Sequence, residues 1–128
     1  EKNMAETDDD VEVRLEDQQH INTFGRLNGR LHDMEDDLKA KQSQYELLDD
    51  AANEIILADD DEPIRYAFGE CYLELTKDQA DEMLEKHKEQ VEEEMNVIKA
   101  ELKRTHETLA DLKTKLYGRF GKNINLEE

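Results

Sequence analysis

The sequence predicts a mostly α-helical fold: a long antiparallel coiled-coil hairpin of two helices, with one small β-hairpin at the bend. Two seven-residue apolar repeats predict the helices, and a segment of period two between them predicts the strands. The first repeat consists of Phe24, Leu27, Leu31, Met34, Leu38, Tyr45, Leu48, Ala52 and Ile55. The second consists of Leu84, Val91, Met95, Ile98, Leu102, Leu109, Leu112 and Leu116. Steps of three and four residues place each series on one helix face, as in coiled coils.

The composition supports helices with a narrow apolar seam. Charged residues make up 41% of the 128 residues and hydrophobic ones 36%. Such a chain is either disordered or coiled coil, and the periodicity favours coiled coil. The net charge of -18 disfavours electrostatic binding of nucleic acid or of an anionic membrane. A single cysteine, Cys71, leaves no internal disulfide, which fits a reducing compartment.

Five segments are expected in chain order. They are a disordered acidic tail (1–14), a first helix (15–58), an acidic stop with a β-hairpin (59–76), a second helix (77–117) and a flexible end (118–128). The first helix is expected to stop because Asp59–Glu62 repel the helix dipole and Pro63 forbids continuation. A capping box at Thr76–Gln79 is expected to start the second helix. The antiparallel fold then brings both chain ends to one tip, where four glycines predict the loosest packing.

The segment of period two predicts a strand pair that assembles with other chains. Its turn at Gly69-Glu70 suits type II′. A lone two-stranded hairpin is marginal in water, so we favour pairing with other subunits over folding onto the adjacent helix ends. Cys71 is expected to be a small buried hydrophobe. The expected assembly residues are Ile64, Tyr66, Phe68, Cys71, Tyr72, Leu73 and Leu75.

The tip carries apolar residues beyond the regular repeat. Two alternatives stay open for them: a surface that binds non-native chains, or end-packing that closes the coiled coil. The candidate residues are Ile21, Phe24, Leu116, Tyr117, Phe120, Ile124 and Leu126.

We expect no catalytic, cofactor or metal site, and therefore no enzyme. Asp59, Asp61 and Glu70 match three positions of a calcium-binding EF loop, but Pro63 and Ile64 occupy positions that contradict such a loop. The four histidines form no i,i+4 pair and have no thiolate partner. No phosphate-binding glycine loop or nucleophile elbow is present in the sequence.

Three stretches resemble the subunit-4 branch of the eukaryotic prefoldin family. Residues 15–22 (LEDQQHIN) resemble its opening, residues 58–72 its acidic run and hairpin, and residues 109–127 its ending. The departures are mild: Leu15 stands for the usual Phe, Gly118 for the usual Ala, and Cys71 lies in the hairpin.

The resemblance implies a β-class subunit of a hetero-hexameric, ATP-independent co-chaperone. In that family six helical hairpins extend from a double β-barrel platform, and their tips hold non-native proteins such as actin and tubulin for the cytosolic group II chaperonin. Residues 64–75 would then belong to the platform, and Phe24 with residues 116–126 to the client-holding tip. The implied location is the cytoplasm, with a nuclear role also open. The alternative is a structural coiled-coil tether that binds no clients.

Overall fold

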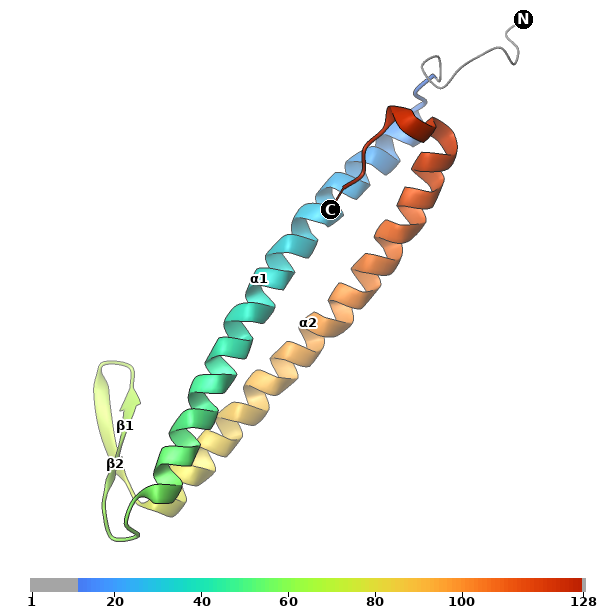
Figure 1. Ribbon diagram of the computed structural model, residues 1–128. Coiled ribbons are helices and arrows are strands. Elements are labelled where there is room, and N and C mark those ends of the chain that lie inside the picture. Colours follow the sequence, from blue (N-terminus) through green and yellow to red (C-terminus); the bar gives the residue numbers. More distant parts are fainter. Residues whose placement is uncertain (1–11, 128) are drawn as a thin grey trace, which may run out of the picture. The chain divides into compact units, whose positions relative to one another are not determined.

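The structure, a computed structural model, describes residues 12–127, without the side chain of Phe68. The expected acidic tail therefore falls largely outside the described residues. Helix α1 spans Leu15–Leu57, strand β1 Ile64–Phe68, strand β2 Cys71–Leu75 and helix α2 Lys77–Phe120 (Figure 1). A 3-10 turn, η2, follows at Gly121–Asn123. The predicted fold class, two long helices with one antiparallel strand pair, is confirmed.

The chain divides into two compact units. The terminal unit combines the residues up to Asp36 with those from Ala100 onward, and the hairpin unit is Asp37–Lys99. Each unit contains a segment of α1 and an antiparallel segment of α2 (Figure 1). Both chain-terminal segments thus belong to one unit, as the antiparallel arrangement predicted.

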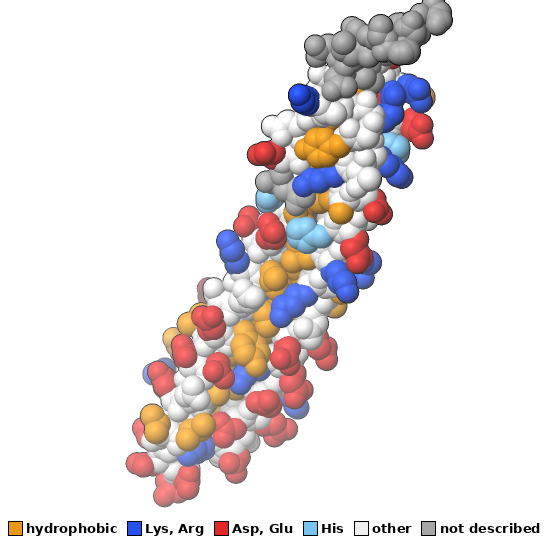
Figure 2. Space-filling model, turned by 45° about the vertical axis from the view of Figure 1, so that its right-hand side comes forward, with side chains coloured by type: hydrophobic (Ala, Val, Ile, Leu, Met, Phe, Trp, Pro, Cys, Tyr) orange, Lys and Arg blue, Asp and Glu red, His pale blue; other side chains and the backbone are white. Residues whose placement is uncertain are grey.

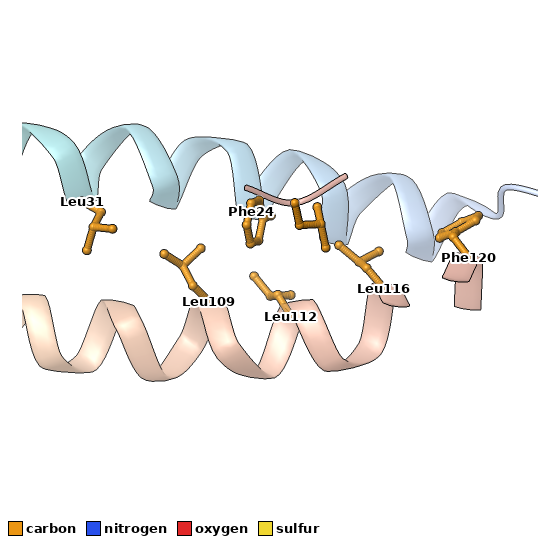
Figure 3. Close-up of a cluster of buried hydrophobic side chains, with 7 residues drawn as sticks. Phe24, Leu31, Leu109, Leu112, Leu116 and Phe120 are labelled. Carbon is orange, nitrogen blue, oxygen red and sulfur yellow. The ribbon is translucent and has the colours of Figure 1, made fainter. Parts of the chain in front are cut away.

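An apolar cluster from both helices forms the core of the terminal unit. Figure 3 shows Phe24 on α1 facing Leu112 on α2, as the heptad register predicted. Leu31 retains 1% of its accessible surface, and Leu109 and Leu116 retain none. The buried members of this cluster are Phe24, Leu31, Leu109, Leu112, Leu116, Phe120 and Leu126.

Helix α2 ends at Phe120, later than the predicted end at Tyr117. Gly118, one of the glycines expected to loosen the tip, disfavours helix but does not stop one. Leu116 and Phe120 are both buried in the cluster, so their packing stabilises the additional turn. The helix instead ends before Gly121, whose φ of +58° is the left-handed conformation typical of a C-terminal cap.

In the hairpin unit, side chains form hydrogen bonds with the backbone groups at the end of α1 and at the start of α2, on either side of the strands. Thr76 Oγ1 accepts a hydrogen bond from the backbone N–H of Gln79 at 3.1 Å, and Gln79 Oε1 accepts one from the backbone N–H of Thr76 at 3.0 Å. This is the reciprocal capping box that the sequence predicted. At the end of α1, Lys77 Nζ donates to the carbonyls of Ile56 and Ala58, both at 3.1 Å. Lys77 thereby supplies the positive charge that the last turn of α1 lacks.

The strand register matches the predicted alternation. Ile64 pairs with Leu75, Tyr66 with Leu73, and Phe68 with Cys71. Gly69 has φ of +62°, and no described non-glycine residue has positive φ, so φ of Glu70 is negative. A type I′ turn needs positive φ at both central residues and is therefore excluded. The signs of φ are those of type II′, as expected.

Lysines interrupt the apolar seam in the hairpin unit, and acidic neighbours compensate for them. Lys88 Nζ lies 2.9 Å from Asp49 Oδ1, and this hydrogen bond raises the pKa of the lysine. Lys41 Nζ lies 3.1 Å from Glu94 Oε1. Both lysines, which the heptad pattern marked as exceptions, therefore keep their stems along the seam while their heads meet carboxylates.

Candidate interaction surfaces

The structure brings the predicted tip residues together, but most of them face inward. Phe24, Leu116, Phe120 and Leu126 are buried, and Ile21 and Ile124 are half-buried against them. Tyr117 alone among the seven candidates is exposed, at 41%. Of the two alternatives left open by the sequence, this arrangement favours end-packing for the folded chain at rest. Their role as client contacts stays a prediction.

The C-terminal segment turns back onto the helices of the terminal unit (Figure 1). After η2 the backbone is extended at Ile124, with φ of −135° and ψ of 144°. The amide of Leu126 donates to the hydroxyl oxygen of Tyr117 at 3.0 Å. The sequence predicted a loose end here, whereas the described segment is packed, because Ile124 and Leu126 both join the apolar cluster.

A part-buried ion pair joins the two helices in the same unit. Asp17 retains 3% of its accessible surface and receives two donors from Arg119. Nε donates to Oδ1 at 3.0 Å and Nη2 to Oδ2 at 2.6 Å. The amide of Arg14 also donates to Oδ2 at 3.0 Å, and Arg119 Nη2 donates to the carbonyl of Glu12 at 2.8 Å. The hydrogen bond from Arg119, followed by that from Arg14, lowers the pKa of Asp17 to about 2.

The sequence contained a signal for this pair that the apolar pattern concealed. Asp17 lies one heptad before Phe24, and Arg119 lies one heptad after Leu112. The seam therefore extends by one further layer, which is ionic instead of apolar. A search for apolar residues alone ends the seam at Phe24 and Leu112, one layer too early. In the next layer a carboxylate and a guanidinium occupy the heptad positions that apolar side chains fill elsewhere.

The β-hairpin divides into a packed base and an exposed outer part. Ile64, Tyr66 and Leu75 pack against the cluster formed by Ile55, Ala80 and Leu84. Tyr72 and Leu73 are exposed, at 63% and 43%. Tyr72 lies on the other face of the strand pair, with the Arg65 guanidinium 4.6 Å from its ring centroid. The base of the hairpin thus folds onto the helix ends, its outer part is exposed, and pairing with other subunits stays a prediction.

Cys71 is exposed, which corrects the expectation of a buried hydrophobe. It pairs with Phe68 next to the turn, whereas the described hairpin side chains that pack on the helix cluster are Ile64, Tyr66 and Leu75, nearer the base. Two further apolar side chains that the pattern did not single out, Ile56 and Leu57, are exposed at 63% and 85% at the end of α1. They follow the last heptad residue, Ile55, and so turn away from the seam.

Charge is distributed unevenly between the two units. Residues 37–99 carry nineteen acidic and seven basic side chains, whereas residues 1–36 and 100–128 together carry sixteen acidic and ten basic ones. Figure 2 shows the acidic side chains gathered over the hairpin unit. Within residues 12–127, no group of three or more His, Cys, Asp or Glu side chains is placed to hold a metal ion. No described helix is long and apolar enough to cross a membrane.

Comparison with known proteins identifies the family. The family described as "Prefoldin subunit" matches residues 18–123. The chain therefore belongs to the prefoldin subunit family, a family of chaperone components. A prefoldin beta subunit from Thermococcus strain KS-1 has the same fold, with a TM-score of 0.78 over 87% of this chain and 97% of that one, at 19% identity.

The more similar relatives are all subunit 4. Prefoldin subunit 4 of Homo sapiens is 39% identical over 120 residues, which cover 93% of this chain and 90% of the human protein. Probable prefoldin subunit 4 of Dictyostelium discoideum is 39% identical over 99% of this chain and 98% of its own length. Prefoldin subunit 4 of Saccharomyces cerevisiae is 34% identical over 91% of each chain. The resemblance indicated by the three sequence stretches is confirmed.

Proposed function

We propose that this chain is one subunit of a hetero-hexameric, ATP-independent co-chaperone that binds non-native proteins and delivers them to the cytosolic chaperonin. Association with other prefoldin subunits follows from the family. The hexamer, the clients actin and tubulin, the chaperonin and a cytoplasmic location, with a nuclear role also open, are parts of the proposal. The observation that carries it is the match to probable prefoldin subunit 4 over 99% of this chain, in a fold whose sheet has two described strands and an exposed outer part.

The strand pair supports assembly because its outer part has no partner within the described chain. Two strands with one packed end leave backbone donors and acceptors at both edges, and pairing with other chains satisfies them. Tyr72 and Leu73 add exposed apolar surface at the same place. A tether that only spaces two partners has no need for such an element.

Client binding is assigned to the terminal unit. Its helices and tail hold the large apolar cluster of this unit, and its net charge of -6 is half the -12 of the hairpin unit, so that acidic unfolded segments meet less repulsion there. The hairpin unit, with its excess of acidic side chains, is assigned to assembly.

The test is to purify the complex from cells through a tag on this chain and to measure its mass and activity. We expect a hexamer of six different small subunits that suppresses aggregation of guanidine-unfolded actin on dilution and transfers it to the purified chaperonin. Stable partners without any protection of unfolded actin or tubulin would support the tether instead. A complex of another size or composition would contradict the hexamer.

A further inference from the structure

The C-terminal segment has the properties of an internal ligand. Residues 124–126, here called the tail, follow η2 with extended backbone at Ile124, and Ile124 and Leu126 lie in the apolar cluster of the terminal unit while Asn125 between them is exposed. The side chain of Asn123, just before the tail, is exposed as well. Alternate residues of an extended segment point to the same side, so the tail presents an apolar-x-apolar pattern to the helices. A segment of an unfolded protein offers this same pattern wherever two apolar residues flank one other residue.

We propose that the tail occupies the client-binding surface of this subunit, and that an extended apolar-x-apolar segment of a non-native protein displaces it. The surface consists of the helical members of the cluster, among them Phe24, Leu112 and Leu116. This inference rests on the proposed function, because it assigns the surface and the regulation of the same client binding. It also explains how residues expected to hold clients are buried in the chain at rest.

The tail is attached weakly enough to leave. Besides its two apolar side chains, the described contact that holds it is the hydrogen bond from the Leu126 amide to Tyr117. Gly121, with its positive φ, provides a turn between helix and tail that other residues rarely adopt. The gain from burying two side chains is opposed by the entropy of ordering the extended residues.

The helices do not depend on the tail to stay together. Arg119 binds Asp17 from the last turn of α2, ahead of Gly121, and Leu109 and Leu116 are fully buried from helical positions. Displacement of the tail therefore leaves the helical side of the surface in place. Because tail and client compete, the apparent affinity for a client is reduced by the fraction of subunits with an open surface.

The first experiment compares two pairs of substitutions in the assembled complex. Ile124→Ser with Leu126→Ser removes the side chains that hold the tail, and Asn123→Ser with Asn125→Ser is the matched control at exposed positions next to and within the tail. The probe is reduced, carboxymethylated α-lactalbumin, a soluble and permanently unfolded protein. We expect the first pair to raise the affinity for the probe by about 3–10-fold, as removal of a competitor that covers most subunits does, and the control to leave it unchanged. An unchanged affinity means that the tail only packs the end, and a reduced affinity means that the tail itself binds clients; either result overturns the inference.

The second experiment follows the wild-type complex, so that it does not depend on a variant that folds. Hydrogen exchange with mass spectrometry is measured on residues 121–128 and on residues 109–116, with and without the same probe. We expect the probe to speed exchange in the tail and to slow it in the helical segment. Slower exchange in both segments, or no change in the tail while the probe is bound, overturns the displacement. Failure of the wild-type complex to bind the probe or unfolded actin at all contradicts the proposed function itself, and the inference falls with it.

Discussion

Asp17 shows how much one polar residue contributes at the end of an apolar seam. Its carboxylate accepts a hydrogen bond from the backbone N–H of Arg14, the residue before the first helical residue. This N–H is one of the donors at the start of α1 that have no partner within the helix. The same carboxylate binds Arg119 on α2. One side chain thus stabilises the start of one helix and joins it to the last turn of the other.

Replacing Asp17 by Asn should lower the thermal midpoint of the full chain at pH 7 by several degrees. The amide keeps the shape but loses the charge that Arg119 and the helix start require. The folded-state pKa of about 2 lies below the ordinary 3.8, so the wild-type advantage is complete above the ordinary value. It is then lost as the pH falls through about 2. Circular dichroism melts of both proteins at a series of pH values measure the gap, which should narrow between about pH 4 and pH 2.

Arg119→Lys is the matched control for this ion pair. Lysine keeps the positive charge but cannot donate from two nitrogens to the two carboxylate oxygens, so its melting point should lie between those of wild type and Asp17→Asn. Equal melting points of Asp17→Asn and wild type at pH 7 would show that the pair does not stabilise the terminal unit.

Sequence reasoning located the apolar residues well and their exposure poorly. Phe24 and Leu112 were predicted to pair, since a heptad fixes which residues share a seam. The burial of Leu126 was one of two alternatives left open and the exposure of Cys71 was not predicted, because neither follows from local periodicity. Both depend on how far an irregular segment reaches from the nearest helix, and only three-dimensional packing determines that distance.

At the scale of elements, the boundaries with explicit chemical signals were the predictable ones. The capping box at Thr76–Gln79 starts α2 as expected, and the acidic run with Pro63 follows the end of α1 at Leu57. The end of α2 was predicted three residues too early, next to Leu116, the last residue of the apolar repeat. Packing of Phe120 outweighs the helix propensity of one glycine, whereas the left-handed Gly121 is a true cap.

Replacing glycine by alanine should have opposite effects on stability at two positions, Gly118 and Gly69. At Gly118 a Cβ would meet nothing within 4 Å, so Gly118→Ala should stabilise α2 by about 1 kcal/mol and raise the melting point by a few degrees. At Gly69 there is equally open space, but φ is +62°, so Gly69→Ala should destabilise the hairpin by about 1–2 kcal/mol. Thermal melting reports the first change, and faster hydrogen exchange over residues 64–75 reports the second. If Gly118→Ala lowered the melting point, the glycine would have a role beyond the helix backbone.

At the scale of the whole molecule, the two units separate two tasks. The hairpin unit contains the exposed strand edges and most of the acidic charge. The terminal unit contains the apolar cluster, the Asp17–Arg119 ion pair and the tail. Substitutions in one unit should therefore affect assembly and those in the other client binding, and this separation allows each property to be tested while the other is kept.

Tyr72→Asp combined with Leu73→Asp should abolish incorporation of this chain into the complex. Both side chains are exposed within the chain, so the substitutions should leave the helix content of the purified chain unchanged while placing charge where other subunits are proposed to pair. Because the two residues lie on opposite faces of the strand pair, Tyr72→Asp and Leu73→Asp alone reveal which face is covered. Tyr72→Phe keeps the ring that lies beside Arg65 and is the matched control, which should assemble normally. Co-purification of the other subunits through a tag on each variant measures the result. Full recovery of these subunits with the double variant would place the subunit contacts elsewhere. The exposed Ile56 and Leu57 would then be the next positions to substitute.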